Sequence, residues 1–274
     1  MKLLTITTLL LSTLFTPIIA QQVPYGNNPE TGDYFEAGGV KLYYEVYGTG
    51  SPILLLHGGV YGYIDEFGPL IPRLVNEGHQ VICLATRGHV KSEVGDEPLS
   101  WEQRADDAYK MLRHLNIDSA TVIGFSDGGQ AALTLAARYP EAVTRVVAMG
   151  VGYFADKSEK SVSAVTSEIL LKQAKNYFDA RLKLMPDPSQ WEKSLQMLND
   201  LYNNKPFEAS TLESIKCKVL FLNGERDGYF PVKTIVMAYE LVPNSSLAII
   251  PDCHHVVFHC NFPAVWESMI GFIK

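Results

Sequence analysis

The sequence lacks a run of basic residues. Its 274 residues include 30 Asp and Glu but only 23 Lys and Arg, which gives a formal net charge of −7 at pH 7. Nucleic acids and anionic membrane surfaces are bound mainly by clustered Lys and Arg side chains. The composition therefore predicts no nucleic-acid partner and no electrostatic attachment to a membrane surface.

Cysteines are also few, because the chain has only Cys83, Cys217, Cys253 and Cys260. With 47% hydrophobic residues, a chain of this length buries a core that needs no disulfide scaffold. Cys83 and Cys217 lie in or beside apolar, strand-like runs and are expected to be buried thiols. Cys253 and Cys260 are close enough in sequence to pair in an exported chain, and the sequence leaves both states open.

A long apolar run occurs only at the start of the chain. Lys2 precedes an apolar stretch at residues 3–15, Pro17 interrupts it, and Ala20 lies before two glutamines. This pattern predicts a signal peptide at residues 1–20 that is cleaved after Ala20, and a secreted or periplasmic protein with no stable membrane anchoring after cleavage. An uncleaved anchor is the alternative, but the run is short for a span.

The remaining chain alternates strand-like and helix-like segments. Residues 21–31 are polar and are expected to form a loose leader, and residues 40–47 alternate like a half-exposed strand. Strand-like runs that are apolar at every position follow at residues 53–56, 81–85, 121–123, 146–149, 219–222 and 247–250. Strands that are apolar on both faces belong to a parallel sheet covered by helices. We therefore expect an α/β fold with a doubly wound, mostly parallel sheet, formed by residues 21–150 and 212–274.

One segment departs from this alternation. Residues 151–211 contain no strand-like run but two helical stripes, and Asp187-Pro188-Ser189-Gln190 is typical of the start of the second helix. We expect this segment to be a helical cap over the carboxyl ends of the strands, where open α/β sheets bind ligands. Two ordinary crossover helices are the alternative.

The stretch around which the chain is organised is Gly-Phe-Ser-Asp-Gly-Gly at residues 124–129. It follows the strand-like residues 120–123 and opens into a helix-like segment. Gly124 and Gly128 remove the Cβ atoms that would clash in a sharp turn between a strand and a helix. This is the context of the Gly-x-Ser-x-Gly nucleophile elbow, in which Ser126 is presented outward.

A nucleophilic serine needs a base and an acid that orients the base. Asp227 follows the strand-like residues 219–222, and His254 and His255 follow residues 247–250. Parallel strands bring these positions to the edge that carries Ser126. Glu225 is the alternative acid and His254 the alternative base.

These motifs resemble the α/β-hydrolase family with a helical cap, over nearly all of the mature chain. His57-Gly58-Gly59 resembles its oxyanion loop, Gly224-x-x-Asp227-x-x-x-Pro231 resembles its acid turn, and residues 251–255 resemble its Pro-Gly-x-Gly-His turn. The elbow is similar to that of the valacyclovir-hydrolase-like branch. The loop at residues 86–92 differs, because Ala85 and Val90 replace an aspartate and a glycine of the family pattern.

The resemblance implies the roles of the site residues. Ser126 attacks an acyl carbon, His255 transfers the proton, and Asp227 orients the imidazole. The backbone N–H groups of Gly59 and Asp127 hold the oxyanion. His57 is expected to orient its loop rather than to act as a base.

A substrate-binding role is expected for five side chains. The Asp127 carboxylate would pair with a substrate ammonium group, and the apolar remainder of the substrate would contact aromatic residues of the cap. These aromatic residues are Tyr177, Phe178, Trp191 and Tyr202. No cofactor and no metal is expected, although Cys253, Cys260 and the nearby histidines have the ligand types of a zinc site.

The leading hypothesis is an exported serine hydrolase that cleaves carboxylic esters through an acyl-enzyme intermediate, with a small-molecule ester as its partner. Amino-acid-type esters, lactones and small amides belong to the same hypothesis. Because a fold does not fix a function, two alternatives remain. One is a cofactor-free perhydrolase or haloperoxidase-like enzyme, and the other is a non-catalytic homologue that binds a small ligand.

Overall fold

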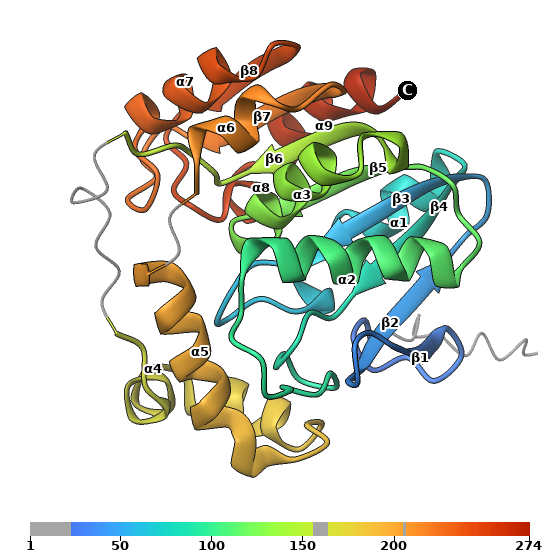
Figure 1. Cartoon of the computed structure of the whole chain (residues 1–274), viewed down its shortest axis with the longest axis vertical. Coiled ribbons are helices and arrows are strands. Elements are labelled where there is room, and N and C mark those ends of the chain that lie inside the picture. The colour runs from blue at the N-terminus through green and yellow to red at the C-terminus, as the bar shows by residue number, and fades with distance from the viewer. Residues whose placement is uncertain (1–22, 156–163, 205–206) are drawn as a thin grey trace, which may run out of the picture.

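Figure 1 shows a computed structural model of the chain, which describes residues 23–155, 164–204 and 207–274. The expected signal peptide at residues 1–20 lies outside these ranges. Within them, no helix combines the length and apolar character needed to cross a membrane.

In the described part of the chain, eight strands form one sheet with the order β1-β2-β4-β3-β5-β6-β7-β8. β2 pairs antiparallel with both β1 and β4, and all other pairs are parallel. The strands are β1 (Gly32–Glu36), β2 (Lys41–Tyr47), β3 (Ser51–Leu56), β4 (His79–Leu84), β5 (Ala120–Phe125), β6 (Val143–Met149), β7 (Lys218–Gly224) and β8 (Ser245–Ile250). The predicted doubly wound, mostly parallel sheet is confirmed. Its strand order reverses between β3 and β5, which is where such sheets bind ligands.

Helices cover both faces of the sheet (Figure 1). The helices are α1 (Ile71–Asn76), α2 (Trp101–His114), α3 (Asp127–Arg138), α4 (Ser167–Leu182), α5 (Trp191–Asn204), α6 (Ala209–Glu213), α7 (Val232–Leu241), α8 (Val257–Cys260) and α9 (Phe262–Ile273), with short 3-10 turns η1 (Ile64–Phe67), η2 (Pro140–Ala142) and η4 (Pro188–Gln190). Leu54 and Leu56 of β3 join the core under α2, α3 and α7, and Ile53 and Leu55 join the core under α1 and α9. This two-sided burial explains why the central strands are mainly apolar rather than alternating.

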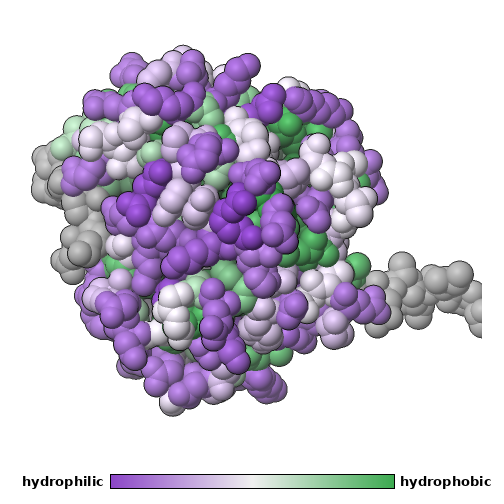
Figure 2. Space-filling model, turned by 45° about the vertical axis from the view of Figure 1, so that its right-hand side comes forward, coloured by the Kyte–Doolittle hydropathy of each residue, from purple (hydrophilic) through white to green (hydrophobic). Residues whose placement is uncertain are grey.

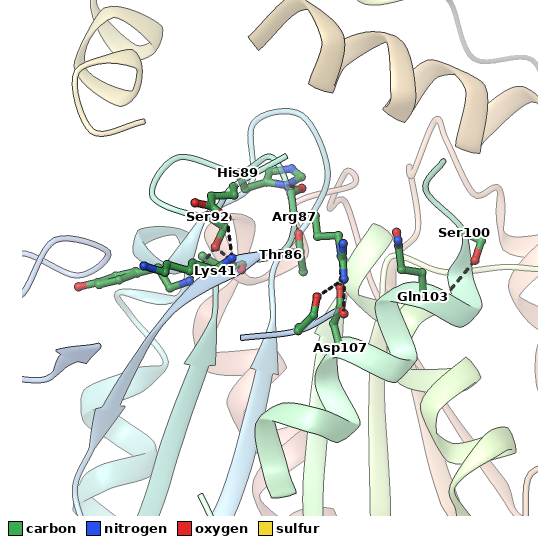
Figure 3. Close-up of polar contacts among 12 residues, drawn as sticks. Lys41, Thr86, Arg87, His89, Ser92, Ser100, Gln103 and Asp107 are labelled. Carbon is green, nitrogen blue, oxygen red and sulfur yellow. Dashed lines mark hydrogen bonds and ion pairs between the residues drawn. The ribbon is translucent and has the colours of Figure 1, made fainter. Parts of the chain in front are cut away.

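Local sequence signals set where the helices begin. Ser100 caps α2 by accepting a hydrogen bond from Gln103 N (3.0 Å), as its Ser-x-x-Gln pattern predicts (Figure 3). Asp187 accepts a hydrogen bond from Ser189 N (3.0 Å) and caps η4, which leads into α5. The helix starts read from these patterns are confirmed.

α4 and α5 form the helical cap, which stands away from the sheet in Figure 1. The cap contacts the loops that follow the parallel strands. Ser194 Oγ in α5 donates a hydrogen bond to Gly88 O (3.1 Å) after β4. Arg181 in α4 pairs with Asp65 (2.8 Å) after β3. The cap therefore lies over the carboxyl ends of the strands.

The surface seen in Figure 2 is mainly hydrophilic. The apolar areas on this face are small and lie between polar residues.

The expectation of a loose leader at residues 21–31 is wrong for the residues that are described. Gly26 N (2.8 Å) and Asn28 N (2.9 Å) donate to the carboxyl group of Glu45 in β2. The hydroxyl groups of Tyr43 (2.8 Å) and Tyr47 (2.7 Å) also donate to it. Glu45 is 0% exposed. The sequence pattern of β2 predicted that this face of the strand is exposed, but the N-terminal segment covers it.

We expect Glu45→Ala to destabilise the fold by at least about 3 kcal/mol, since it leaves several buried donors without an acceptor. The measurement is the free energy of unfolding from urea denaturation. Glu97→Ala is the control, because Glu97 is exposed. Equal losses in the two variants would show that the Glu45 carboxyl does not hold the N-terminal segment.

Candidate active site

Ser126 lies at the turn between β5 and α3. Its φ is +51° and its ψ is −113°, a strained conformation that costs about 1–3 kcal/mol. The surroundings hold it there, because Ser126 N donates to Met149 O (2.7 Å) and Ser126 O accepts from Gln130 N (3.0 Å). Ser126 remains partly exposed, so its hydroxyl is accessible at the carboxyl edge of the sheet.

The close approach of α3 to β3 depends on glycine. A Cβ atom at Gly128 would lie 2.0 Å from Leu56 O and 2.6 Å from His57 O. Any other residue there would push the start of α3 away from the loop after β3. Gly128 therefore brings Ser126 and the loop of His57 to one place.

A chain of hydrogen bonds joins Ser126 to His255 and Asp227. His255 Nε2 lies 2.9 Å from Ser126 Oγ, and His255 Nδ1 lies 2.8 Å from Asp227 Oδ2. The other carboxylate oxygen of Asp227 accepts from Tyr229 N (2.8 Å) and Phe230 N (2.9 Å). Because the carboxylate accepts, Nδ1 carries the proton and Nε2 is free to accept from the serine hydroxyl. This arrangement suits a serine, a general base and an orienting acid.

The alternative base and acid face other groups. His254 is exposed, and its Nδ1 donates to Arg226 O (3.1 Å). Glu225 accepts from Asp252 N (3.1 Å). The structure therefore brings His255 and Asp227, rather than His254 and Glu225, to Ser126.

The two residues proposed to provide the oxyanion donors lie close together. Asp127 N is in the first turn of α3, where backbone N–H groups have no partner within the helix. A Cβ atom at Gly59 would lie 2.9 Å from Asp127 Oδ2, so the loop after β3 contacts the start of α3. Within the described residues, neither Gly59 N nor Asp127 N donates a hydrogen bond. Both are available to an oxyanion.

His57 orients the loop that carries Gly59. Its Nδ1 donates to Gly58 O (2.7 Å), and its Nε2 accepts from Thr86 N (3.0 Å). Burial lowers the pKa of His57 from 6.5 to about 3, so the ring is neutral and keeps one donor and one acceptor. With both nitrogens engaged, His57 is not placed to be a base.

The position of Asp127 corrects an expectation. Its side chain is 2% exposed, and its Oδ2 pairs with Arg104 (3.2 Å) in α2. The same oxygen accepts from Tyr202 Oη (2.8 Å) in α5. Asp127 Oδ2 therefore has a cation and a hydroxyl as partners inside the protein, whereas Oδ1 has no hydrogen-bond partner among the described residues. Arg104 was not among the residues expected at the site.

Two aromatic residues expected in the pocket wall lie elsewhere. Phe178 is 2% exposed and packs with Leu170 and Leu195 in the small core between α4 and α5, and Trp191 packs against this core. These side chains pack together because α4 and α5 place their apolar residues against each other. Tyr177 is exposed, and its hydroxyl donates to Tyr61 O. Of the four aromatic residues, only Tyr202 contacts Asp127.

The loop at residues 86–92 is braced from both sides (Figure 3). Arg87 makes two hydrogen bonds to Asp107 (2.6 and 2.9 Å) in α2. Ser92 Oγ donates to Ala85 O (2.7 Å). Val90, which stands where the resembled family has glycine, has a φ of +50°. The loop therefore keeps a glycine-type backbone conformation without the glycine.

The segment after β8 contains a disulfide rather than a zinc site. Cys253 and Cys260 are bonded to each other, so neither provides a thiolate ligand. Among the described residues, no three His, Cys, Asp or Glu side chains form a group that could hold a metal ion. Cys83 and Cys217 are free thiols. Cys83 is buried, as expected, but Cys217 is only partly buried, so the expectation is wrong for Cys217.

Comparisons with known proteins agree with the fold. The model of the family described as alpha/beta hydrolase fold matches residues 51–193. A putative esterase/lipase of Haemophilus influenzae is 25% identical over 234 residues, which cover 78% of this chain and 79% of that protein. The serine hydrolase BPHL of Homo sapiens is 24% identical over 244 residues, which cover 79% of this chain and 77% of that protein.

A solved structure shows the same fold. The enol-lactonase from Burkholderia xenovorans LB400 matches with a TM-score of 0.70 at 16% identity, over 88% of this chain and 99% of that protein. The family match covers more than half of the chain. The chain therefore belongs to the α/β hydrolase fold family and is a hydrolase.

Proposed function

We propose that the chain is a serine hydrolase that cleaves carboxylic esters through an acyl-enzyme intermediate on Ser126. The observation that carries this proposal is the continuous hydrogen-bonded path from Ser126 Oγ through His255 to the buried Asp227. Ser126, at the end of this path, is partly exposed and has a strained backbone conformation.

The geometry supports two half-reactions. His255 accepts the proton of Ser126 as Oγ attacks the ester carbon, and the N–H groups of Gly59 and Asp127 stabilise the oxyanion. His255 then protonates the leaving alcohol, which departs and leaves the acyl group on Ser126. A water molecule, deprotonated by His255, then attacks this acyl group. As the acid leaves, His255 returns the proton to Ser126 Oγ. Asp227 stabilises the imidazolium in both steps.

The names of similar proteins support an ester or lactone as the substrate class. They include a putative esterase/lipase and an enol-lactonase. The test is a panel of p-nitrophenyl esters and a lactone against the purified mature protein. Release of p-nitrophenol well above the rate without enzyme supports the proposal, and inertness toward the whole panel contradicts it.

A preference for amino-acid-type esters is not expected, because Arg104 already balances the charge of Asp127. We expect kcat/KM for an α-amino ester and its des-amino analogue to agree within about threefold in the wild type. Asp127→Asn should act mainly on stability, since it leaves the buried Arg104 unpaired, a change that typically costs about 3–5 kcal/mol. A large preference for the amino ester that Asp127→Asn removes would restore the ammonium-binding role.

We also propose that the protein is exported and that the signal peptide is removed after Ala20. The support is the apolar segment at residues 3–15 between Lys2 and Ala20. The N-terminal residue of the protein from its native host is expected to be Gln21. Recovery of Met1 would contradict export by this route.

A further inference from the structure

Two side chains hold the peptide groups on either side of Gly58. Gly58 N donates to Glu66 Oε1 (2.6 Å), and Gly58 O accepts from His57 Nδ1 (2.7 Å). Only the two backbone torsions of Gly58 lie between these contacts. Fixing both peptide groups therefore fixes those torsions.

The second of these peptide groups contains a proposed oxyanion donor. Gly58 O and Gly59 N belong to one planar trans peptide, so the carbonyl and the N–H point in opposite directions. A contact that fixes the carbonyl of Gly58 therefore also aims the N–H of Gly59. Gly58 has no side chain to restrict its backbone torsions. The direction of the Gly59 N–H therefore depends on the contacts with His57 and Glu66.

Glu66 is itself held in place. It lies in η1, whose Ile64 and Phe67 are buried. Its carbonyl oxygen accepts from His259 Nε2 (2.9 Å), in α8. The Glu66 carboxyl group therefore lies on a short turn that other parts of the chain hold in place. This turn is separate from the loop of Gly58 that the carboxyl group contacts.

We propose that Glu66 is a positioning residue for the oxyanion donor Gly59 N, acting through its hydrogen bond to Gly58 N. The inference rests on the proposed function, because the oxyanion that Gly59 N would bind forms in the transition state of ester hydrolysis. Glu66 does not touch the substrate in this account. It prevents the Gly58 peptide from rotating and turning the N–H of Gly59 away from the oxyanion.

Glutamine is the matched replacement for Glu66. Glu66 is only partly exposed, and burial raises the pKa of its carboxyl from 4.5 to about 8. At neutral pH the carboxyl is therefore mostly uncharged, and it accepts from Gly58 N through an oxygen that Gln also provides. Leu has a similar size but no acceptor.

The experiment compares Glu66→Gln and Glu66→Leu in ester hydrolysis at pH 7. We expect Glu66→Leu to lower kcat by about 10- to 100-fold, part of the loss typical of a removed oxyanion donor. KM should stay within about threefold, because the oxyanion exists only in the transition state. Glu66→Gln should recover most of kcat. Glu97→Gln, which changes an exposed acid outside the site, is the control and should have little effect.

Several results would overturn the inference. They are an unchanged kcat in Glu66→Leu, a loss confined to KM, or an equal loss in Glu66→Gln. If Glu66→Leu does not fold, Glu66→Asp replaces it, because the shorter side chain keeps the acid but withdraws it from Gly58 N, and kcat should still fall. Loss of activity in Ser126→Ala, measured alongside, tests the proposed function separately. Ester hydrolysis that depends on Ser126 but not on Glu66 contradicts this inference alone.

Discussion

Replacing Ser126 with alanine is expected to lower kcat for ester hydrolysis by at least about 10³-fold. The substitution removes the hydroxyl that His255 Nε2 contacts at 2.9 Å. The fold should remain, because this hydroxyl is partly exposed and caps no helix. The measurement is the kcat of both proteins on the best p-nitrophenyl ester.

Two checks make this result interpretable. Circular dichroism and the Tm of Ser126→Ala should match the wild type within a few degrees, which separates lost chemistry from lost structure. Residual activity above about one part in a thousand, in a preparation free of other esterases, would point to a different nucleophile. The acyl-enzyme proposal would then fail.

His255→Ala is expected to lower kcat by about 10³-fold or more, and His254→Ala by less than about tenfold. His255 bridges Ser126 and Asp227, whereas His254 contacts the carbonyl oxygen of Arg226. The pair is a matched control, because the two substitutions are adjacent and remove the same side chain.

The reverse pattern would contradict the assignment of the base. If His254→Ala were the damaging change, the histidine turn would be shifted by one residue from the register in the structure. If neither change mattered, Ser126 would not be activated by this segment at all.

The turns of the site could be predicted from the sequence because each signal is local. Ser126, Asp227 and His255 each follow a short apolar strand, and parallel strands bring such positions to one edge of a sheet. Glycines mark the elbow, whose Gly128 lies against β3. Even Asp252, which replaces a glycine of the resembled pattern, has a φ of +58°.

The partner of Asp127 could not be predicted in this way. Arg104 lies in α2, and no local pattern links it to the elbow. A signal was nevertheless present, because Arg104 falls on the apolar face of that helix, three residues after Trp101 and four before Ala108. A charged residue on a buried face requires a partner of opposite charge. The sequence does not show which acid provides it.

The cap and the N-terminal segment show a second limit. Periodicity predicts an apolar stripe that contains Phe178, but it does not say whether the stripe faces the pocket or the neighbouring helix. Likewise, the alternation of β2 places Glu45 opposite the main core, yet the N-terminal segment buries it. In both cases the packing partner is distant in sequence, and only the folded structure identifies it.

The most direct test of the central claim, an activated serine at position 126, is labelling with a fluorophosphonate followed by peptide mass spectrometry. The wild type is expected to carry one adduct, on Ser126, with a parallel loss of ester hydrolysis. His255→Ala should label far more slowly, because the base that activates Ser126 is gone. An unlabelled wild type, or an adduct on another residue with activity lost in step, would contradict the account.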